Sequence, residues 1–536
     1  MNPNDGSDGS ELSHPGKGPI QTSQFAYDRV AYTGAPDPLI HLRHLEVASA
    51  MFGLRPSDIS SCRVLELGCA DGTNLLPYAV EFEGGTFVGV DLAIQRIQKA
   101  NQAVETLRLS NISFHHADVC DIGAELGQFD YVLVPGVYSW ATEEARDAII
   151  RICRECLRDD GVATISYNTR PGWNWMDGLR EFMTQRVNPS DPPEQQIAQA
   201  RGAVELLASL TPASTAHGAY YQRVRDDLRQ RRDTYLYHEY LTNHSQSFYF
   251  HEFEQQLRKQ GLKYVADADF KLASGFGLDS NGRAAIARTP AEEKEQLRDF
   301  LLHTSYRRSI ICHEGVVLTE TPQHEHLQRL EVVWASSLRD RPVDSGFSKP
   351  IELPFDEGSV TISDPLTMAA IGVLKKHWPH PIPFTDLHDR ACESMATVMG
   401  KVAEPSPNPD QANTLARTLL AFQAVGLLKA FRTSPRIAKE ISNRPRVGPQ
   451  VRFAAKHGLA VVNQWHTSLP QLSGEQRHLL AHLDGNHDQS QLAEVVSTFR
   501  NNNDAPDGGS ITTQPRDSES VETMLRSFAE MLLLMD

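Results

Sequence analysis

Short apolar runs that end in glycine or acidic residues mark the first third of the chain. The run Val64–Leu67 leads into the turn Gly68–Gly72, and the run Phe87–Val90 leads into Asp91. Apolar runs of this length, bounded by turn residues, are typical of buried parallel strands. The segment between the two runs is long enough for a helix. The pattern therefore predicts a βαβ unit near the start of the chain.

The same alternation continues after this unit. We expect a third strand at Ile112–His115, which leads to Asp118, and a fourth at Tyr131–Val134, which leads into Pro135–Trp140. The carboxyl ends of parallel strands share one edge of a sheet. The polar residues that follow these strands are therefore expected to form one site.

Helical periodicity and loop-rich stretches divide the remainder of the chain. Leu366–His377 and Gln411–Val425 have the spacing of amphipathic helices. The expected fold class is α/β, with a Rossmann-like domain, a mainly helical middle domain and a helical, winged-helix-like C-terminal domain. The expected divisions are a disordered tail (1–23), the Rossmann-like domain (24–190), the middle domain (195–335), a linker rich in Ser, Asp, Pro and Gly (336–362) and the C-terminal domain (363–536).

The glycine-rich turn suggests a ligand that approaches the backbone. Its small residues leave room for close contact, and Thr73 or Asn74 is expected to cap the helix that follows. Starting at Glu66, the turn reads E-x-G-x-x-x-G, which differs from the G-x-G-x-x-G of nicotinamide dehydrogenases.

Acidic residues at the next two strand ends indicate a nucleoside. A carboxylate at Asp91 can accept both hydroxyls of a ribose, and one at Asp118 can accept the exocyclic amine of an adenine. Together with Glu66, this arrangement resembles the class I methyltransferases, which use S-adenosylmethionine.

The composition narrows the range of partners. The 536 residues have a net charge of −16 and no long basic run, so a nucleic-acid partner is not expected. No apolar stretch is long enough to span a membrane, and the first residues lack the apolar core of a secretory signal. Seven cysteines without disulfide-like spacing favour a cytoplasmic location, with Cys153 and Cys156 expected as packed thiols. His115 and His116 are adjacent on a strand and face opposite sides, so no metal site is predicted.

Several longer motifs extend the resemblance. VLELGCADGTNLLPYA, FVGVDL, GVYSW and SYNTRPGW resemble bacterial methyltransferases that carry a methyltransferase regulatory domain. That domain is echoed at Thr234–Phe270, and a winged-helix-like region is echoed around Pro365–Arg390. Characterised members of this family methylate lysines of outer-membrane proteins. The resemblance therefore implies a protein acceptor; whether the chain forms a homodimer is left open.

The resemblance also assigns site residues. The cofactor-binding set it implies is Tyr27, Glu66, Gly68, Ala70, Gly72, Asp91, Leu92, Asp118, Val119 and Gly136. It places Tyr138, Trp140 and Tyr167 at the reacting methyl group, and these three residues are the predicted catalytic set. The chain departs from the family pattern at Pro135, Asn174 and Met176, near the expected acceptor.

Three functions follow from these observations. The leading one is a protein lysine methyltransferase, in which aromatic walls lower the pKa of the lysine by desolvation and attract its ammonium group. The second keeps the cofactor and has a small-molecule acceptor. The third is a non-catalytic regulatory protein that binds the cofactor without turnover.

Overall fold

The computed structural model describes residues 30, 36–242, 244–335, 347, 349–355, 358–399, 409–469, 472–503 and 520–536. The chain divides into two compact units, each described by itself. One consists of Met1–Thr33, Leu92–Gln95 and Leu179–Asn243, and the other of Gly34–Asp91, Arg96–Gly178 and His244–Asp536. The expected tail at 1–23 and Tyr27 lie outside the described residues.

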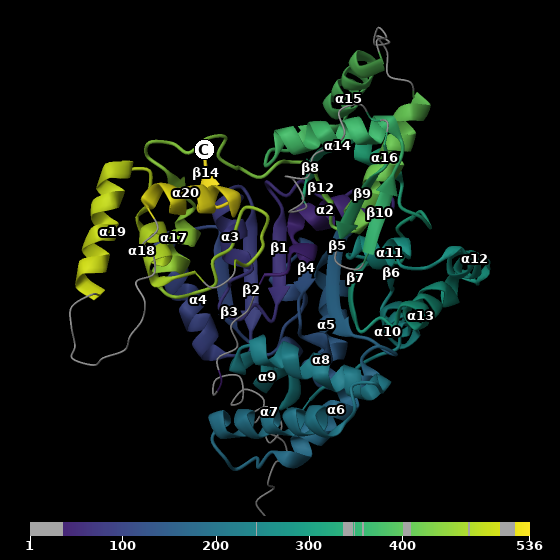
Figure 1. Cartoon of the computed structure of the whole chain (residues 1–536). Coiled ribbons are helices and arrows are strands. Elements are labelled where there is room, and N and C mark those ends of the chain that lie inside the picture. Colours follow the sequence, from purple (N-terminus) through teal and green to yellow (C-terminus); the bar gives the residue numbers. More distant parts are fainter. Residues whose placement is uncertain are drawn as a thin grey trace, which may run out of the picture. The chain divides into compact units, whose positions relative to one another are not determined.

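The larger unit is built on a seven-stranded sheet with strand order β3-β2-β1-β4-β5-β7-β6 (Figure 1). The first five strands pair in parallel, whereas β7 runs antiparallel to both of its neighbours. The strands are β1 (Arg63–Leu67), β2 (Thr86–Asp91), β3 (Ile112–His116), β4 (Phe129–Val134), β5 (Leu157–Asn168), β6 (Leu262–Asp267) and β7 (Tyr306–His313). This arrangement confirms the predicted α/β fold class and the first four predicted strands.

The strand order reverses next to β1. From β1 the chain proceeds outward to β2 and β3 on one side, and then returns to β4 and β5 on the other. Ligands of open α/β sheets bind in the crevice that such a reversal creates at the carboxyl ends of the strands. The fold therefore positions a site at the ends of β1, β2, β3 and β4.

Successive side chains of a strand point to opposite faces of the sheet. Each face of this sheet is covered by its own cluster of buried side chains. Val64 belongs to one buried cluster and Leu65 to the other. The first cluster includes residues of α2, α3 and α4, and the second includes residues of α5 and α10, with the buried thiols of Cys153 and Cys156 packed as predicted. The elements in this part are η1 (Pro38–Ile40), α2 (Leu42–Met51), α3 (Leu75–Glu81), α4 (Ile94–Leu107), η2 (Val119–Asp121), η3 (Ala124–Leu126), η4 (Tyr138–Trp140), α5 (Glu143–Cys156), α10 (Phe250–Lys259), α11 (Phe270–Ser274), α12 (Ser280–Arg288) and α13 (Ala291–Leu302).

The last two strands of the sheet come from the segment expected to be a separate middle domain. β7 pairs with β5 from Ala163 to Asn168, and β6 then pairs with β7. The sheet thus crosses the boundary expected near residue 190. The strand β7 was not predicted, because its sequence YRRSIICH mixes two arginines with apolar residues. Most of the sequence around it has the periodicity of helices.

The smaller unit is helical. Its main segment holds the end of α6 (Asn174–Arg186), together with α7 (Pro193–Leu210), α8 (Ala216–Gln230) and α9 (Asp233–Tyr240). Arg201 on α7 ties these helices together, since its guanidinium donates to the carbonyl of Arg231 at 3.0 Å and pairs with Asp233 at 2.7 Å.

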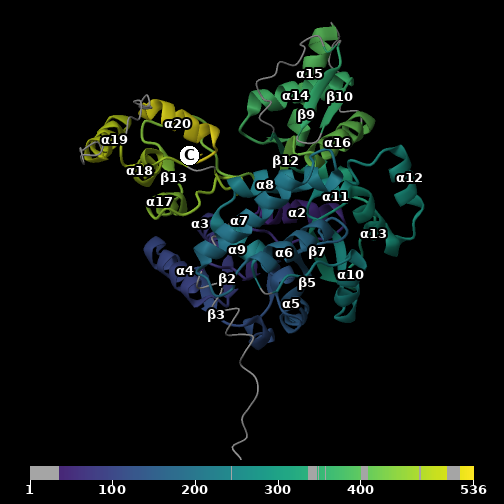
Figure 2. The ribbon, with the colours of Figure 1, turned by 60° about the horizontal axis from the view of Figure 1, so that its bottom comes forward.

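The C-terminal part of the larger unit contains two groups of elements (Figures 1 and 2). In one, α14 (Pro365–His377), α15 (Phe384–Met399) and α16 (Pro409–Ala424) accompany a three-stranded sheet of β11 (Ile382–Pro383), β8 (Glu331–Trp334) and β12 (Leu428–Phe431), with η5 (His324–Arg329) beside them. The other has its own core and comprises α17 (Pro449–Lys456), α18 (Gly474–His482), α19 (Gln489–Asn503), α20 (Val521–Glu530), β13 (Arg446–Val447) and β14 (Leu534–Met535).

The segment expected as a linker is not featureless. β9 (Ile351–Phe355) and β10 (Gly358–Ile362) form an antiparallel hairpin within residues 336–362. Leu353 and Ile362 are buried in the main core, so this hairpin is packed against the larger unit.

Candidate active site

The turn after β1 requires its glycines. Gly68 and Gly72 both have a φ of +76°, a left-handed conformation that favours glycine. A Cβ at Gly68 would lie 2.2 Å from Val137 Cγ2, and one at Gly72 would lie 2.4 Å from Phe114 Cζ. Ala70, between them, has a φ of +47°. The turn therefore needs small residues both for its conformation and for the space around it.

Asp91 holds this turn in place. Its Oδ2 accepts a hydrogen bond of 2.8 Å from the backbone N–H of Ala70. The residue expected to bind the ribose thus also fixes the loop expected to border the methionine part of the cofactor. Leu92 follows directly in the chain and belongs to the smaller unit.

The ends of β3 and β4 complete the edge. Asp118 begins η2, where its Oδ1 accepts from the backbone N–H of Cys120 at 2.9 Å, and the half-buried Val119 packs against the core. Gly136 follows β4 with a φ of +63°, and a Cβ added there would meet no atom within 4 Å. Its N–H donates to Ser166 Oγ at 2.7 Å. The structure therefore brings the predicted residues of β1, β2, β3 and β4 to one edge, with open space beside Gly136.

Glu66 lies beneath this edge, with only 2% of its surface exposed. Burial raises its pKa to about 8, and the nearby carboxylates of Asp91 and Asp71 act in the same direction. Asn74 Nδ2 donates to Glu66 Oε2 at 3.1 Å and opposes this shift. A cationic ligand would stabilise the ionised form of Glu66, as the amino group of a bound methionine moiety would do.

The prediction that Thr73 or Asn74 caps α3 was wrong. Asn74 occupies the N-cap position but has helical dihedral angles, and its side chain makes no capping hydrogen bond. The hydroxyl of Thr73 donates instead to Asp71 Oδ1 at 2.6 Å. The amide of Asn74 is used within the site, and local sequence preference gives no indication of that role.

Two of the three predicted catalytic residues are in the core. Tyr138 and Tyr167 are fully buried and belong to an aromatic cluster, in which Tyr167 lies 4.2 Å from Phe253 between ring centroids. The hydroxyl of Tyr138 donates to Gln256, and that of Tyr167 accepts from Ser309 at 3.3 Å. Both rings are therefore packed in the core, one just after β4 and the other near the end of β5. Their assignment to the reacting methyl group stays a prediction.

Trp140 is placed differently from these two tyrosines. It ends η4 and is half-buried. Among the residues that depart from the family pattern, Pro135 directly follows β4, and Asn174 and Met176 lie in the first turn of α6.

Sequence reasoning missed three polar residues at this edge: Asn74, Ser166 and Gln256. Ser166 could have been found, because a hydroxyl within the apolar run VATISY of β5 needs a partner when it is buried. Gln256 contacts Tyr138 from α10, more than a hundred residues later in the chain. No local pattern indicates that contact.

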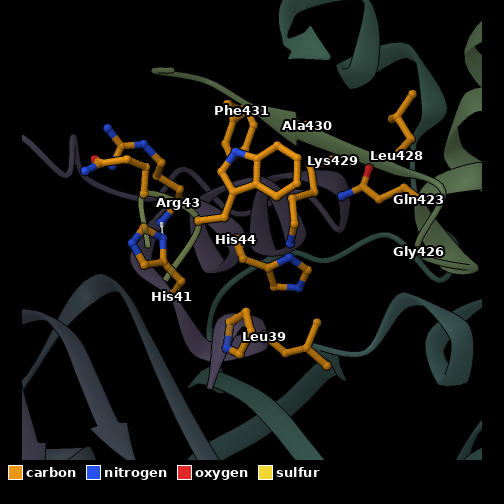
Figure 3. Close-up of a pocket in the computed structure, with 13 residues that line it drawn as sticks. Leu39, His41, Arg43, His44, Gln423, Gly426, Leu428, Lys429, Ala430 and Phe431 are labelled. Atoms are coloured by element: carbon orange, nitrogen blue, oxygen red, sulfur yellow. Dashed lines mark hydrogen bonds between the residues drawn. The ribbon is translucent and has the colours of Figure 1, made fainter. Parts of the chain in front are cut away.

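The larger unit also contains a cavity of about 110 Å³ (Figure 3). Residues of η1, α2 and β12 line it, including Leu39, His41, His44 and Lys429. None of the predicted cofactor residues contributes to this cavity.

Comparison with known families assigns three parts of the chain. Residues 64–161 match a methyltransferase domain, residues 232–313 match a predicted methyltransferase regulatory domain, and residues 443–533 match the C-terminal winged helix domain of PKMT. Residues 64–161 form a methyltransferase domain. The winged-helix match confirms the expected C-terminal domain type, but it begins after Pro365–Arg390, the region in which the likeness was seen.

Some similar proteins match most of the chain. The fold is similar to that of PKMT2 from Rickettsia typhi, with a TM-score of 0.78 and 22% identity, over 94% of this chain and 100% of that chain. A structure of PKMT2 in complex with AdoHcy has a TM-score of 0.76. An uncharacterized protein of Rickettsia prowazekii is 27% identical over 88% of this chain and 85% of its own length.

Another relative matches a short part of the chain. Magnesium-protoporphyrin O-methyltransferase from Rhodobacter capsulatus is 35% identical over 85 residues, which are 16% of this chain and 36% of that enzyme. The methyltransferase domain and the acidic strand ends indicate S-adenosylmethionine as the cofactor, and the chain is assigned as an S-adenosylmethionine-dependent methyltransferase. In the part of the chain that the structure describes, no helix combines the length and apolar character needed to cross a membrane.

Proposed function

We propose that this methyltransferase modifies lysine side chains of a protein. The observation that most supports this acceptor class is the match of residues 443–533 to the PKMT winged helix domain. The fold likeness to PKMT2 along nearly the whole chain is consistent with it. Much of the chain lies beyond the methyltransferase sheet, and such additional domains suit a large acceptor better than a small one.

The reaction makes limited demands on the protein. S-adenosylmethionine supplies a methyl group on a sulfonium, whose carbon–sulfur bond breaks as the lysine nitrogen forms its bond to carbon. The lysine must first release a proton to solvent to expose its electron pair. The protein mainly has to hold the two partners in line and exclude water. We assign Glu66, Asp91 and Asp118 to holding the cofactor, on the evidence of their common edge.

Trp140 is the predicted catalytic residue best suited to meet the acceptor. It lies in η4, shortly after β4, and is half-buried, whereas Tyr138 and Tyr167 are fully buried. An aromatic face attracts an alkyl-ammonium and displaces water from it, which favours the neutral amine. Tyr138 and Tyr167 would then support this wall from the core.

The test is transfer of a radioactive methyl group from S-adenosylmethionine to a bacterial lysate separated into membrane proteins, soluble proteins and small molecules. The membrane fraction is included because an outer-membrane protein is the acceptor that the resemblance favours. We expect label in a protein band, recovered as methyl-lysine after hydrolysis.

Matched variants make the result specific. Asp91→Ala should strongly reduce labelling when S-adenosylmethionine is limiting, whereas Asp121→Ala removes an exposed carboxylate at the end of η2 and should not. Label found only among small molecules would contradict the protein acceptor and favour a small-molecule methyltransferase. Cofactor binding without any label in all three fractions would favour the non-catalytic function.

A further inference from the structure

A histidine of the C-terminal winged-helix region reaches the methyltransferase site. His466 lies between α17 and α18, within the matched residues 443–533, and only 2% of its surface is exposed. Its Nε2 lies 2.7 Å from Asn74 Oδ1, and Asn74 Nδ2 donates to Glu66 Oε2 at 3.1 Å. A continuous hydrogen-bonded relay of three buried side chains therefore joins the two domains.

The chemistry of the three side chains determines which group donates and which accepts in each hydrogen bond. The amide nitrogen of Asn74 faces Glu66 and its oxygen faces His466, an orientation that suits the ionised carboxylate expected with a bound cationic ligand, since that carboxylate can only accept. His466 must then donate from Nε2. Burial lowers the pKa of His466 to about 3, so the ring is neutral and carries its proton on that nitrogen.

Ring contacts hold His466 in this position. It stacks on Tyr78 of α3, with ring centroids 4.7 Å apart and planes 13° apart, and it lies 4.7 Å from the ring of His41. His41 is fixed in turn, because its Nδ1 accepts from the backbone N–H of Arg43 at 3.1 Å (Figure 3). The imidazole is thus packed on the helix that bears Asn74 at its N-cap.

The backbone of the C-terminal region presents the ring in a tight turn. His466 has a φ of +59°, a conformation that a residue of this kind rarely adopts. The side-chain oxygen of Asn463 accepts from the N–H groups of Trp465 and Thr467, each at 3.0 Å, and its Nδ2 donates to the carbonyl of Met531 at 3.1 Å. Backbone strain tends to persist where a feature has a function.

We propose that His466 is a positioning residue for the cofactor site: through Asn74 it orients the carboxylate of Glu66, and so couples the winged-helix region to cofactor binding. The proposal rests on S-adenosylmethionine as the cofactor and does not depend on the acceptor. Without His466, the buried oxygen of Asn74 would lose its donor, and the amide would be held against Glu66 by only one of its two hydrogen bonds.

The test compares two substitutions of His466 in the full chain by calorimetric titration with S-adenosylmethionine. His466→Asn tolerates the left-handed backbone but is too short to reach Asn74, and we expect a loss of affinity of about tenfold. His466→Gln retains an N–H at a similar reach and should stay within about twofold of the original chain. His482→Asn, on α18 of the same region, should leave the affinity unchanged, because His482 bonds to its own helix.

The pH profile separates positioning from a purely structural role. The groups around Glu66 that influence its charge are Asn74, Asp91 and Asp71. Loss of the Asn74 hydrogen bond in His466→Asn should raise the pKa of Glu66 and move the rise of affinity with pH to higher values. A variant that merely unfolds more easily would keep the original midpoint.

A second variant protects the test against misfolding of the first. Asn74→Ala cuts the relay from the other side, and His466→Asn in that background should cause no further loss of affinity. Unchanged affinity and pH profile in His466→Asn, with normal binding by the original chain, would overturn this proposal alone. Failure of the original chain to bind S-adenosylmethionine would overturn the cofactor assignment and the proposal with it.

Discussion

The carboxylate of Asp91 has one observed role and one expected role. It accepts from Ala70 in the glycine turn, and it occupies the strand end at which a ribose is expected. Asp91→Ala should therefore weaken binding of S-adenosylmethionine by about 1.5–3 kcal/mol, measured by calorimetry. Asp91→Asn keeps an acceptor for Ala70 and should lose less. Equal affinity in Asp91→Ala and the original chain would contradict the nucleoside site.

Glu66 makes cofactor binding depend on pH. Its pKa is about 8 in the free protein, because of burial and the neighbouring carboxylates. A bound ammonium group favours the ionised form, so the complex has a lower pKa, and binding below pH 8 releases a proton. Affinity should rise from pH 6 toward about pH 8 as Glu66 ionises, and then fall as the amine of the ligand loses its proton.

Glu66→Gln is the control for this pH dependence, since its affinity should change with pH only through the amine of the ligand. Titrations in buffers of different ionisation enthalpy would count the released protons. An identical pH dependence in the two chains would exclude Glu66 as the titrating group.

Among the strands, β7 depends on a buried cation. Arg307 is fully buried, pairs with Asp299 at 2.8 Å and Glu295 at 3.1 Å, and stacks over Phe250 at 4.7 Å. Arg307→Leu would leave these carboxylates buried without their partner, which should lower the free energy of unfolding by about 3–5 kcal/mol. Denaturant titration measures this loss.

Arg258→Ala is the matched control for the β7 cation. Arg258 forms an exposed pair with Glu254 on α10, and its loss should cost less than about 1 kcal/mol. A similar loss in the two variants would mean that the Arg307 pairs contribute little.

The elements that the sequence predicted are those with local signals. β1 and β2 were recognisable because short apolar runs ended in glycine or aspartate, and their ends carry residues that we propose to hold the cofactor. Tyr138 and Tyr167 looked like channel walls because their burial depends on α10, a distant helix that supplies Phe253 and Gln256. Asn74 looked like a cap because its partner His466 lies 392 residues away in the sequence. Long-range packing, which no local pattern encodes, decided each of these cases.

The whole methyltransferase sheet requires residues that lie far beyond its expected end. A fragment of residues 1–190 lacks β6 and β7, so β5 would present the edge from Ala163 to Asn168 without its antiparallel partner. Such an edge exposes unpaired backbone groups and promotes aggregation. We expect this fragment to be insoluble or to unfold without a cooperative transition, as monitored by circular dichroism. Cooperative unfolding of the soluble fragment would contradict this expectation.

The division of the chain also has a consequence for recombination between relatives. The smaller unit consists mainly of one continuous stretch, Leu179–Asn243, whose neighbours Gly178 and His244 both belong to the larger unit. An exchange with junctions at those two points would move this stretch whole, with the first junction inside α6. The matched regulatory domain begins at residue 232, inside this stretch, and ends with β7. A graft cut at the limits of that match would divide the stretch and remove two strands from the recipient sheet, whereas one cut at Gly178 and His244 would leave every strand with its partners.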